Sequence, residues 1–351
     1  MSRAENQRDA IPAALRAMEV GRERDPASTG PDGPVARFNS VIERADVEAA
    51  QSRIRAHVRE TPIIELDLEA VAGPAFFKLE FLQHTGTFKA RGAFNRMLAA
   101  RARGELDPEV GIVVASGGNA GMANAFAAAR LGVPATVFVP ETAPAVKLAK
   151  LREYGADVVL TGAEYATAFD AAQRRVAETG AVYCHAYDQP EIAAGAGTLA
   201  LELTRQIPGQ LDTVIVAVGG GGLMAGVATA LEGVAKVVGV EPTTAATLHT
   251  ALLNGRPTDV PVSGVAADSL GARRLGDIAF DVATRTAVES VLVSDDDIVT
   301  ARRLLWSRWR ILVEHGAAAA FAALTSGSYI QHPFERLAVV LCGANTSPAD
   351  L

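Results

Sequence analysis

Residues 214–226 read VIVAVGGGGLMAG, and this stretch decides the class of fold. An apolar, β-branched run comes first, which predicts a buried strand. Four glycines, Gly219–Gly222, follow it, and the apolar residues after them favour a helix. Consecutive glycines let the backbone close around an anion, and the first turn of a helix leaves N–H groups without partners. The stretch therefore predicts a strand–loop–helix unit that can hold a phosphate group.

The same alternation of strand and helix extends along most of the chain. Short β-rich runs occur at AFFKLEF (75–81), GIVVAS (111–116), ATVFVP (135–140), DVVL (157–160), TVIVAV (213–218), VVGVE (237–241) and LAVVLCG (337–343). Helical patterns occupy 89–103 and 119–130, and Ser294 can cap a helix that opens with three aspartates. This rhythm predicts an α/β fold, with two lobes that each contain a twisted, mostly parallel sheet flanked by helices.

Composition limits the classes of function. The 351 residues are 49% hydrophobic and 21% charged, which suits a globular enzyme with a large core. A net charge of −7, without basic clusters, argues against nucleic acid and anionic membranes as partners, and no apolar run is long enough to span a bilayer. Only Cys184 and Cys342 occur, which indicates a reducing, cytoplasmic compartment. Residues 1–35 lack an apolar signal core and are expected to form a disordered tail.

Lys89 is the first candidate for chemistry. It lies in TFKARGAFNRM (87–97), where a helix is expected to begin just after an apolar strand. Most lysines are solvated surface charges. At this position, however, partial burial and the dipole of the helix N-terminus would both favour the neutral, nucleophilic amine.

A second candidate site is the turn in VVASGGNAGMANAF (113–126). The predicted strand ends at Ser116-Gly117-Gly118-Asn119, and a helix begins there, so that free backbone N–H groups converge. Such a turn can bind a carboxylate, and the Asn119 amide can donate to a phenolate-like oxygen.

The glycine loop also permits a different interpretation. Gly220, Gly222 and Ala225 match the G-x-G-x-x-A form of the dinucleotide fingerprint, and Glu241 stands about 20 residues on, where a ribose-binding acid would lie. The motif is not in an opening βαβ unit, however, and a nicotinamide enzyme would leave Lys89 and the turn at Ser116 unexplained.

Five stretches occur in the order found in fold-type II pyridoxal-phosphate (PLP) enzymes: FFKLEFLQHTGTFKARGA (76–93), VVASGGNAG (113–121), AVGGGGLMAG (217–226), VEHGAAAAFAAL (313–324) and VLCGAN (340–345). Over about residues 40–347 the chain resembles the serine/threonine dehydratases of this tryptophan synthase β-like class. TFKARGA is closer to dehydratases than to cysteine synthases, in which Asp-Arg usually follows the lysine segment.

The resemblance implies a role for each site residue. Lys89 would be the Schiff-base lysine and the base, Phe88 would pack beside the pyridine ring, and Asn119 would bond the 3-oxygen of the cofactor. The phosphate would be held by Gly219, Gly220, Gly221, Gly222 and Leu223, with Glu314 near the cofactor and Cys342 facing the pyridine nitrogen. The substrate carboxylate would dock on Ser116, Gly117, Gly118, Asn119 and Ala120.

Some positions depart from the family pattern. Gly117 replaces the serine with which racemases of this fold move a proton on the far face of the substrate, so racemisation is not expected. Ala120 replaces a usual histidine. Glu241 resembles the first ligand of a divalent or monovalent cation site, but Thr247 stands where the acidic partner is expected. Glu314 is followed by His315-Gly316 instead of Pro-Gly, and a surface salt bridge is an alternative role for it.

The resemblance also implies an organisation and an activity. Residues 36–110 and 188–351 would form a large PLP-binding domain, and 111–187 a small mobile domain, in a homodimer. No regulatory domain is expected after CGAN (342–345). The expected activity is β-elimination from L-threonine or L-serine, which yields a 2-oxo acid and ammonia. Alternatives are another β-substituted substrate such as 3-hydroxyaspartate, a serine racemase-like enzyme, a silent PLP-binding relative, or the nicotinamide oxidoreductase.

Overall fold

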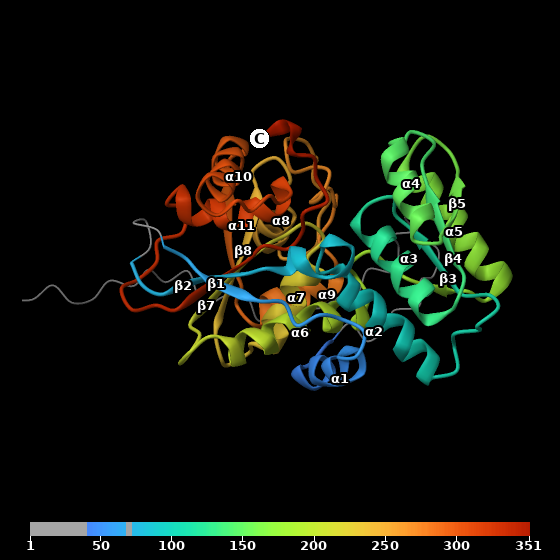
Figure 1. The fold of residues 1–351 in the computed structure, drawn as a ribbon, viewed down its shortest axis with the longest axis horizontal. Helices are drawn as coiled ribbons and strands as arrows, with labels where there is room; N and C mark the ends of the chain where they lie inside the picture. The colour runs from blue at the N-terminus through green and yellow to red at the C-terminus, as the bar shows by residue number, and fades with distance from the viewer. Residues whose placement is uncertain (1–40, 68–71) are drawn as a thin grey trace, which may run out of the picture. The chain divides into compact units, whose positions relative to one another are not determined.

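The computed structural model describes residues 41–67 and 72–351. The tail predicted at residues 1–35 lies outside these residues. Within them the chain forms two sheets flanked by helices (Figure 1). Each of the seven predicted β-rich runs contains a strand, and the predicted α/β fold with two mostly parallel sheets is confirmed. Among the helices of the described ranges, none is long and apolar enough to cross a membrane.

The larger sheet contains six strands in the order β1 (Ile63–Glu65), β2 (Ala75–Lys78), β10 (Leu337–Val340), β7 (Thr213–Ala217), β8 (Lys236–Pro242) and β9 (Glu289–Val293). Only β1 runs antiparallel to its neighbour. Every residue of β7 and β10 is buried, because helices cover both faces of the sheet. Strands β1 and β9 were not predicted: both end the sheet, β1 has no buried residue, and in β9 only Val291 and Val293 are buried.

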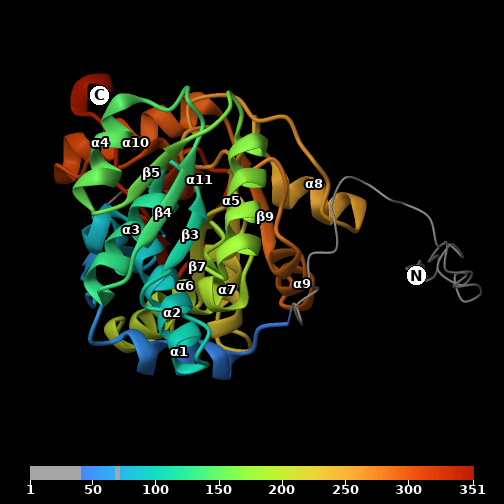
Figure 2. The ribbon, with the colours of Figure 1, turned by 90° about the vertical axis from the view of Figure 1, so that its right-hand side faces the viewer.

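The smaller sheet contains four parallel strands in the order β5 (Asp157–Leu160), β4 (Ala135–Val139), β3 (Ile112–Ala115) and β6 (Val182–Tyr183). Alternate residues of β3 belong to different cores. Ile112 and Val114 pack on the side of α3 (Asn119–Leu131), and Val113 and Ala115 pack on the side of α5 (Tyr165–Thr179). Figure 2 shows α5 beside these strands. The boundaries and the mobility of the domain expected at 111–187 stay predictions.

The remaining helices connect and cover the two sheets. They are α1 (Arg44–Ile54), α2 (Lys89–Ala102), α4 (Ala145–Glu153), α6 (Pro190–Gln206), α7 (Gly222–Ala230), α8 (Thr247–Asn254), α9 (Asp277–Arg285), α10 (Asp295–Trp309) and α11 (His315–Thr325), with 3-10 turns η1 (Glu80–Leu82), η2 (His84–Gly86) and η3 (Pro348–Asp350). Figure 1 shows α10 and α11 on one side of the larger sheet and α6 and α7 on the other. Helix α2 contacts both α3 and α6, so it joins the two groups of elements. Ser294 caps α10 as predicted, because its hydroxyl accepts from the Asp297 N–H.

Helices α6 and α7 cross at two glycines. A Cβ atom on Gly226 would lie 2.1 Å from the Ala193 carbonyl oxygen, and one on Gly197 would lie 2.3 Å from the Gly226 carbonyl oxygen. Only glycine permits this approach of the two backbones. The contact fixes α7, and therefore the glycine loop that precedes it, against the rest of the larger domain.

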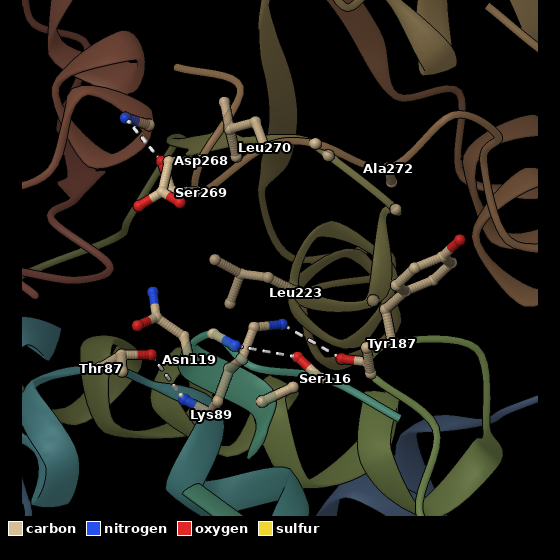
Figure 3. Close-up of a pocket in the computed structure, with 18 of the residues that line it drawn as sticks. Thr87, Lys89, Ser116, Asn119, Tyr187, Leu223, Asp268, Ser269, Leu270 and Ala272 are labelled. Carbon is tan, nitrogen blue, oxygen red and sulfur yellow. Dashed lines mark hydrogen bonds between the residues drawn. The ribbon is translucent and has the colours of Figure 1, made fainter. Parts of the chain in front are cut away.

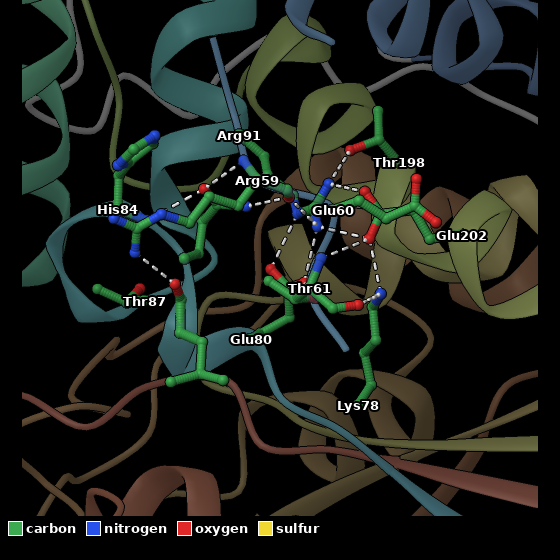
Figure 4. Close-up of polar contacts among 12 residues, drawn as sticks. Arg59, Glu60, Thr61, Lys78, Glu80, His84, Thr87, Arg91, Thr198 and Glu202 are labelled. Carbon is green, nitrogen blue, oxygen red and sulfur yellow. Dashed lines mark hydrogen bonds and ion pairs between the residues drawn. The ribbon is translucent and has the colours of Figure 1, made fainter. Parts of the chain in front are cut away.

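A buried ion cluster fixes the start of α2 (Figure 4). The Arg91 guanidinium donates to both oxygens of Glu80 at 2.8 and 2.9 Å and to both oxygens of Glu202 at 2.6 and 2.9 Å. Lys78 donates to Glu202 at 2.6 Å. The two cations balance the two carboxylates, as buried charges require. Because the cluster joins β2, η1, α2 and α6, it holds the backbone two residues beyond Lys89.

Candidate active site

A cavity of about 600 Å³ opens between residues of the two sheets, where several strands end (Figure 3). Its volume is typical of small-molecule sites, which span roughly 300–1,000 Å³. Nearly all predicted site residues line it: Phe88, Lys89, Ser116, Gly117, Gly118, Asn119, Ala120, Gly219, Gly220, Gly221, Gly222, Leu223, Glu314 and Cys342. The fold thus brings segments from five parts of the chain to one place. Of the predicted residues, Glu241 alone is absent from this lining.

Lys89 is the first residue of α2, and its side chain reaches the cavity. Its backbone N–H donates to the Thr87 hydroxyl at 3.2 Å, and its amine donates to the Ala186 carbonyl at 3.1 Å. Burial lowers the pKa of the amine, although Cys342 and Glu314 act in the opposite direction. Lys89 therefore loses its proton more readily than a surface lysine, as a nucleophile or base requires.

The turn from Ser116 to Ala120 joins β3 to α3. The Gly118 N–H donates to the Ser116 hydroxyl at 3.3 Å, which holds the turn in shape. The next N–H groups belong to the first turn of α3, where no carbonyl of the helix is available to accept them. The geometry suits an anion at this end of the cavity, as the sequence predicted.

Asn119 is held by two partners beyond its own helix. Its side-chain amide N–H donates to the two Glu314 oxygens at 2.8 and 3.0 Å, and its oxygen accepts from the Asn345 side chain at 2.8 Å. The Asn345 backbone N–H also donates to Glu314, at 2.9 Å. Glu314 and Asn345 together hold the Asn119 amide in one orientation at the cavity.

Glu314 is only 7% exposed, so the alternative of a surface salt bridge is wrong. Burial raises the pKa of its carboxyl, and the hydrogen bonds from Asn119 and Asn345 oppose that rise. Asn345 was not predicted as a site residue. It stands in the CGAN segment that carried the resemblance, so its position in the motif was the available signal.

The glycine loop between β7 and α7 has the geometry of a cradle. Gly221 has a φ of 86°, which favours glycine, and a Cβ on Gly220 would lie 2.4 Å from the Tyr187 ring. Tyr187 packs on the loop, and its hydroxyl donates to the Arg274 carbonyl at 3.3 Å. Because α7 begins at Gly222, its free N–H groups lie beside the loop. These features fit a phosphate group.

Cys342 lines the same cavity from the end of β10. Burial raises the pKa of its thiol to about 12, so the group stays neutral at physiological pH. The carbonyl of Cys342 accepts from the Phe88 N–H at 3.1 Å, which ties this strand end to the lysine segment. A neutral thiol at this position can accompany an aromatic ring nitrogen without placing a negative charge beside it.

Glu241 is fully buried away from the cavity. Its carboxylate accepts from the Leu248 N–H at 2.7 Å, the His249 N–H at 2.9 Å and the Thr247 hydroxyl at 2.9 Å, and burial raises its pKa to about 7. It therefore holds the start of α8. In the described parts of the chain no group of three or more His, Cys, Asp or Glu side chains could hold a metal ion. The arrangement does not supply the partners that a cation, or a ribose, would need at Glu241.

Several cavity residues were not predicted. His185 and Tyr187 follow the two-residue strand β6, which is too short to show a pattern in the sequence. Lys147 and Asp268 form an ion pair between α4 and the loop before α9, and Ser269 accepts from the Gly316 N–H at 3.1 Å. Because these side chains lie on loops and helix surfaces far apart in sequence, only the folded chain shows that they share one cavity.

The fold and the cavity define an α/β enzyme in which a buried lysine lies between a phosphate cradle and an anion-binding turn. Comparison with known proteins identifies the group. Residues 54–343 match the family described as pyridoxal-phosphate dependent enzyme, and the chain belongs to this family. The predicted fold-type II class, related to serine/threonine dehydratases, and the predicted PLP cofactor are confirmed.

Individual relatives cover most of the chain. It is 39% identical to a phenylserine dehydratase of Ralstonia pickettii, over 86% of this chain and 93% of the relative. It is 38% identical to an L-threonine ammonia-lyase of Geobacter sulfurreducens, over 79% of this chain and 69% of the relative. The structure of serine racemase from Dictyostelium discoideum superposes with a TM-score of 0.81 at 30% identity, over 87% of this chain and 99% of that one. These relatives share the fold and differ in their named reactions.

Proposed function

We propose that this protein is an ammonia-lyase that eliminates water from a β-hydroxy L-amino acid, with L-threonine and L-serine as the first candidates. The products would be a 2-oxo acid and ammonia. The observation that carries the proposal is the position of Lys89, a partly buried amine of lowered pKa between the turn at Ser116 and the glycine cradle. The dehydratase and ammonia-lyase names of the relatives support the same reaction.

Different residues of the chain would bind the cofactor, bind the substrate carboxylate and transfer the proton. Gly219–Gly222 and the start of α7 would hold the phosphate of PLP, and Asn119 would donate to its 3-oxygen. When bound, PLP supplies an electron-withdrawing ring that acidifies the α-proton of an amino acid attached to it. The amine of Lys89, once free, takes this proton. The turn at Ser116 binds the substrate carboxylate and so orients the Cα–H bond toward Lys89.

Cys342 and Glu314 set the charge around the cofactor. Because the Cys342 thiol is neutral, it can contact the pyridine nitrogen without holding a proton there. Glu314 fixes the orientation of the Asn119 amide by accepting two hydrogen bonds from it. Both features would favour rapid loss of the β-hydroxyl over a long-lived accumulation of negative charge in the pyridine ring.

The same residues argue against racemisation. A racemase needs a group that exchanges a proton on the face of the substrate opposite the lysine. Gly117 has no side chain, and a Cβ there would lie 3.2 Å from a Val139 methyl group. Position 117 therefore has no side chain that could exchange a proton, and a larger residue there would press against Val139.

A substrate with an aromatic β-substituent is a second candidate. Rings form a continuous series near the cavity: Tyr165 with Phe169, Phe169 with Tyr183, Tyr183 with His185 and His185 with Tyr187, at centroid distances of 6.2, 6.1, 6.2 and 4.7 Å. Tyr165, His185 and Tyr187 line the cavity itself. Aromatic walls favour an aromatic guest, and the Ralstonia relative is named for phenylserine.

We also propose closure of the small domain, residues 111–187, over the bound substrate. Lys147 of α4 and Asp268 of the facing loop form an ion pair, and both line the cavity. Such a contact would stabilise a closed arrangement that excludes water. The expected assembly as a homodimer is part of the same proposal and rests on the resemblance alone.

The first experiment compares three substrates. The purified holoenzyme receives L-threonine, L-serine or L-threo-3-phenylserine, and release of 2-oxo acid and ammonia is measured beside the visible absorbance of the cofactor. Product from any of them supports the lyase. A cofactor band without product from all three would contradict the proposed reaction, and inversion of serine without product would indicate a racemase.

A variant of Tyr165 tests whether the cavity prefers a substrate with an aromatic β-substituent. Tyr165→Ala should lower kcat/KM for phenylserine roughly tenfold and change that for threonine much less, because only the aryl group buries area against the ring. Tyr165→Phe is the matched control and should resemble the wild type. Equal losses of kcat/KM for phenylserine and threonine would show that the Tyr165 ring does not set the preference between them.

A further inference from the structure

His185 is fixed in one orientation by the backbone that follows it. Its Nδ1 atom accepts from the Asp188 N–H at 2.8 Å and from the Tyr187 N–H at 3.2 Å. An imidazole nitrogen that accepts two N–H groups cannot carry a proton. The hydrogen of the neutral ring must therefore be on Nε2.

The ring is also kept uncharged. Burial and, to a smaller extent, the nearby Lys89 together lower the pKa of His185 to about 4. The imidazole is then neutral at physiological pH, with a single tautomer. It can donate one hydrogen bond and cannot act as a cation beside the Lys89 amine.

The Nε2–H group is left for an occupant of the cavity. His185 lines that cavity, and Nδ1 is turned toward the backbone of residues 187 and 188. In the part of the chain that the structure describes, no residue accepts a hydrogen bond from Nε2. The His185 side chain is partly buried, and a donor at the wall of a cavity can bind an acceptor on a molecule that enters it.

The segments that flank His185 indicate which part of a bound molecule could accept this hydrogen bond. Strands β3 and β6 are parallel neighbours, with Val113 paired to Tyr183 and the Cys184 N–H donating to the Val113 carbonyl. The two strands therefore end at the same edge, one leading to the turn at Ser116 and the other to His185. On the other side, the adjacent Ala186 carbonyl accepts from the Lys89 amine. His185 thus lies between the anion-binding turn and the lysine.

We propose that the Nε2–H group of His185 donates a hydrogen bond to the carboxylate of the bound amino acid, as a substrate-binding group added to the backbone of the Ser116 turn. This inference rests on the proposed function, because it assumes that the cavity binds an amino acid. A neutral donor adds a hydrogen bond to the carboxylate without adding a positive charge, and so it leaves the Lys89 amine free to accept a proton.

Two substitutions separate this role from a structural one. In His185→Asn the side-chain oxygen replaces Nδ1 and can still accept from the backbone, but the Nε2–H group is lost. In His185→Gln the amide N–H takes the place of Nε2–H, but the acceptor at Nδ1 is lost. His185→Asn therefore keeps the acceptor and loses the donor, whereas His185→Gln keeps the donor and loses the acceptor.

The test uses L-alanine, an amino acid without a β-leaving group, titrated into PLP-loaded protein by calorimetry. His185→Asn should bind L-alanine roughly tenfold more weakly than wild type, the effect of one hydrogen bond to a charged group. His185→Gln should lie within about threefold of wild type. With the substrate found above, the Asn variant should show a raised KM and a kcat that falls less than about threefold.

The opposite ranking would overturn the proposal. If His185→Asn binds L-alanine like wild type while His185→Gln is impaired, or if His185→Asn loses bound PLP, the ring only supports the backbone of residues 185–188. A loss in kcat with KM unchanged would place the hydrogen bond on the leaving group and equally contradict a carboxylate contact. Because L-alanine binding needs no turnover, these outcomes differ from failure of the proposed lyase, in which wild type binds L-alanine without eliminating any substrate.

Discussion

Two cations near the start of α2 meet opposite environments. The side chain of Lys89 lies in the cavity with no carboxylate within an ion-pair distance in the described residues, and burial lowers its pKa. Arg91 is fully buried and is bonded to Glu80 and Glu202, and these carboxylates raise its pKa although burial opposes them. Burial without a partner thus produces a reactive amine, and burial with two partners produces a permanent structural charge.

The position of Lys89 depends on this difference. The ion cluster joins β2, η1, α2 and α6, so that it sets where α2 begins. It also keeps the Glu80 carboxylate ionised: burial alone would raise the pKa of Glu80, but Arg91 and Lys78 hold it below its usual value. The position of Lys89 in the cavity therefore depends on a neighbouring ion cluster that does not line the cavity.

Removing the amine should have the largest effect. Lys89→Ala should lower kcat with L-threonine at least about 10⁴-fold, because the nucleophile and the base are lost together. The cofactor should then be removable by dialysis, and borohydride should fix none to the protein. The melting temperature is the control and should change little. Retained turnover would show that Lys89 is not the lysine that holds the cofactor.

Removing the paired cation should act on stability. Arg91→Met leaves Glu80 and Glu202 buried without their partner, which should destabilise the protein by about 3–5 kcal/mol. Chemical denaturation of the apoenzyme measures this loss. Arg91→Lys, which keeps the charge but not the planar fork, should lie between the variant and wild type. A change of less than about 1 kcal/mol in Arg91→Met would contradict the assigned role of the cluster.

The two cations should also differ in their effect on pH dependence. The pKa of Lys89 is lowered in the folded state from an ordinary value of 10.5, so the unfolded chain binds more protons between the two values. The stability of the apoenzyme should therefore rise with pH across that window. Lys89→Met should remove this part of the slope, as measured by denaturation at a series of pH values. An unchanged slope would mean that burial does not disfavour the Lys89 charge.

The smallest effect should come from the other end of α2. Arg103 is exposed and paired with Glu105 and Glu191, and its side chain is 43% accessible. Solvent screens such pairs, so Arg103→Ala should change stability by less than about 1 kcal/mol. Denaturation under the conditions used for Arg91 gives the comparison. A loss as large as that of Arg91→Met would show that pairing, and not burial, sets the contribution of these ions.

The positions of the main elements could be predicted from local pattern. The strand-glycine-helix unit at Thr213–Ala230, the helix that begins at Lys89 and the cap at Ser294 all appear where the sequence placed them. These features depend on neighbours within a few residues. The strands β1, β6 and β9 were missed because they are short or half-exposed, and their partners lie far away in the sequence.

The site was predicted in part for the same reason. The glycine loop, the turn at Ser116 and Lys89 could each be proposed from a short continuous segment of the sequence. His185, Asn345 and Asp268 carry theirs only through contacts with other segments, such as the bond from Asn345 to Asn119. Glu241 shows the reverse case: its spacing suggested a ligand-binding acid, but the fold turned its carboxylate to the backbone of α8.

The amino-acid sequence by itself determined the α/β alternation, the glycine loop and the choice of Lys89 as the candidate reactive lysine, because each depends on local spacing and residue type. Only the tertiary structure decided which side chains share the cavity and which ions are paired. Those properties arise when parallel strands end at one edge and when helices such as α2 and α6 meet, and both events join residues that are distant along the chain. Lys89 and Arg91 are two residues apart in the sequence, and the folded chain makes one of them a reagent and the other a fixed support.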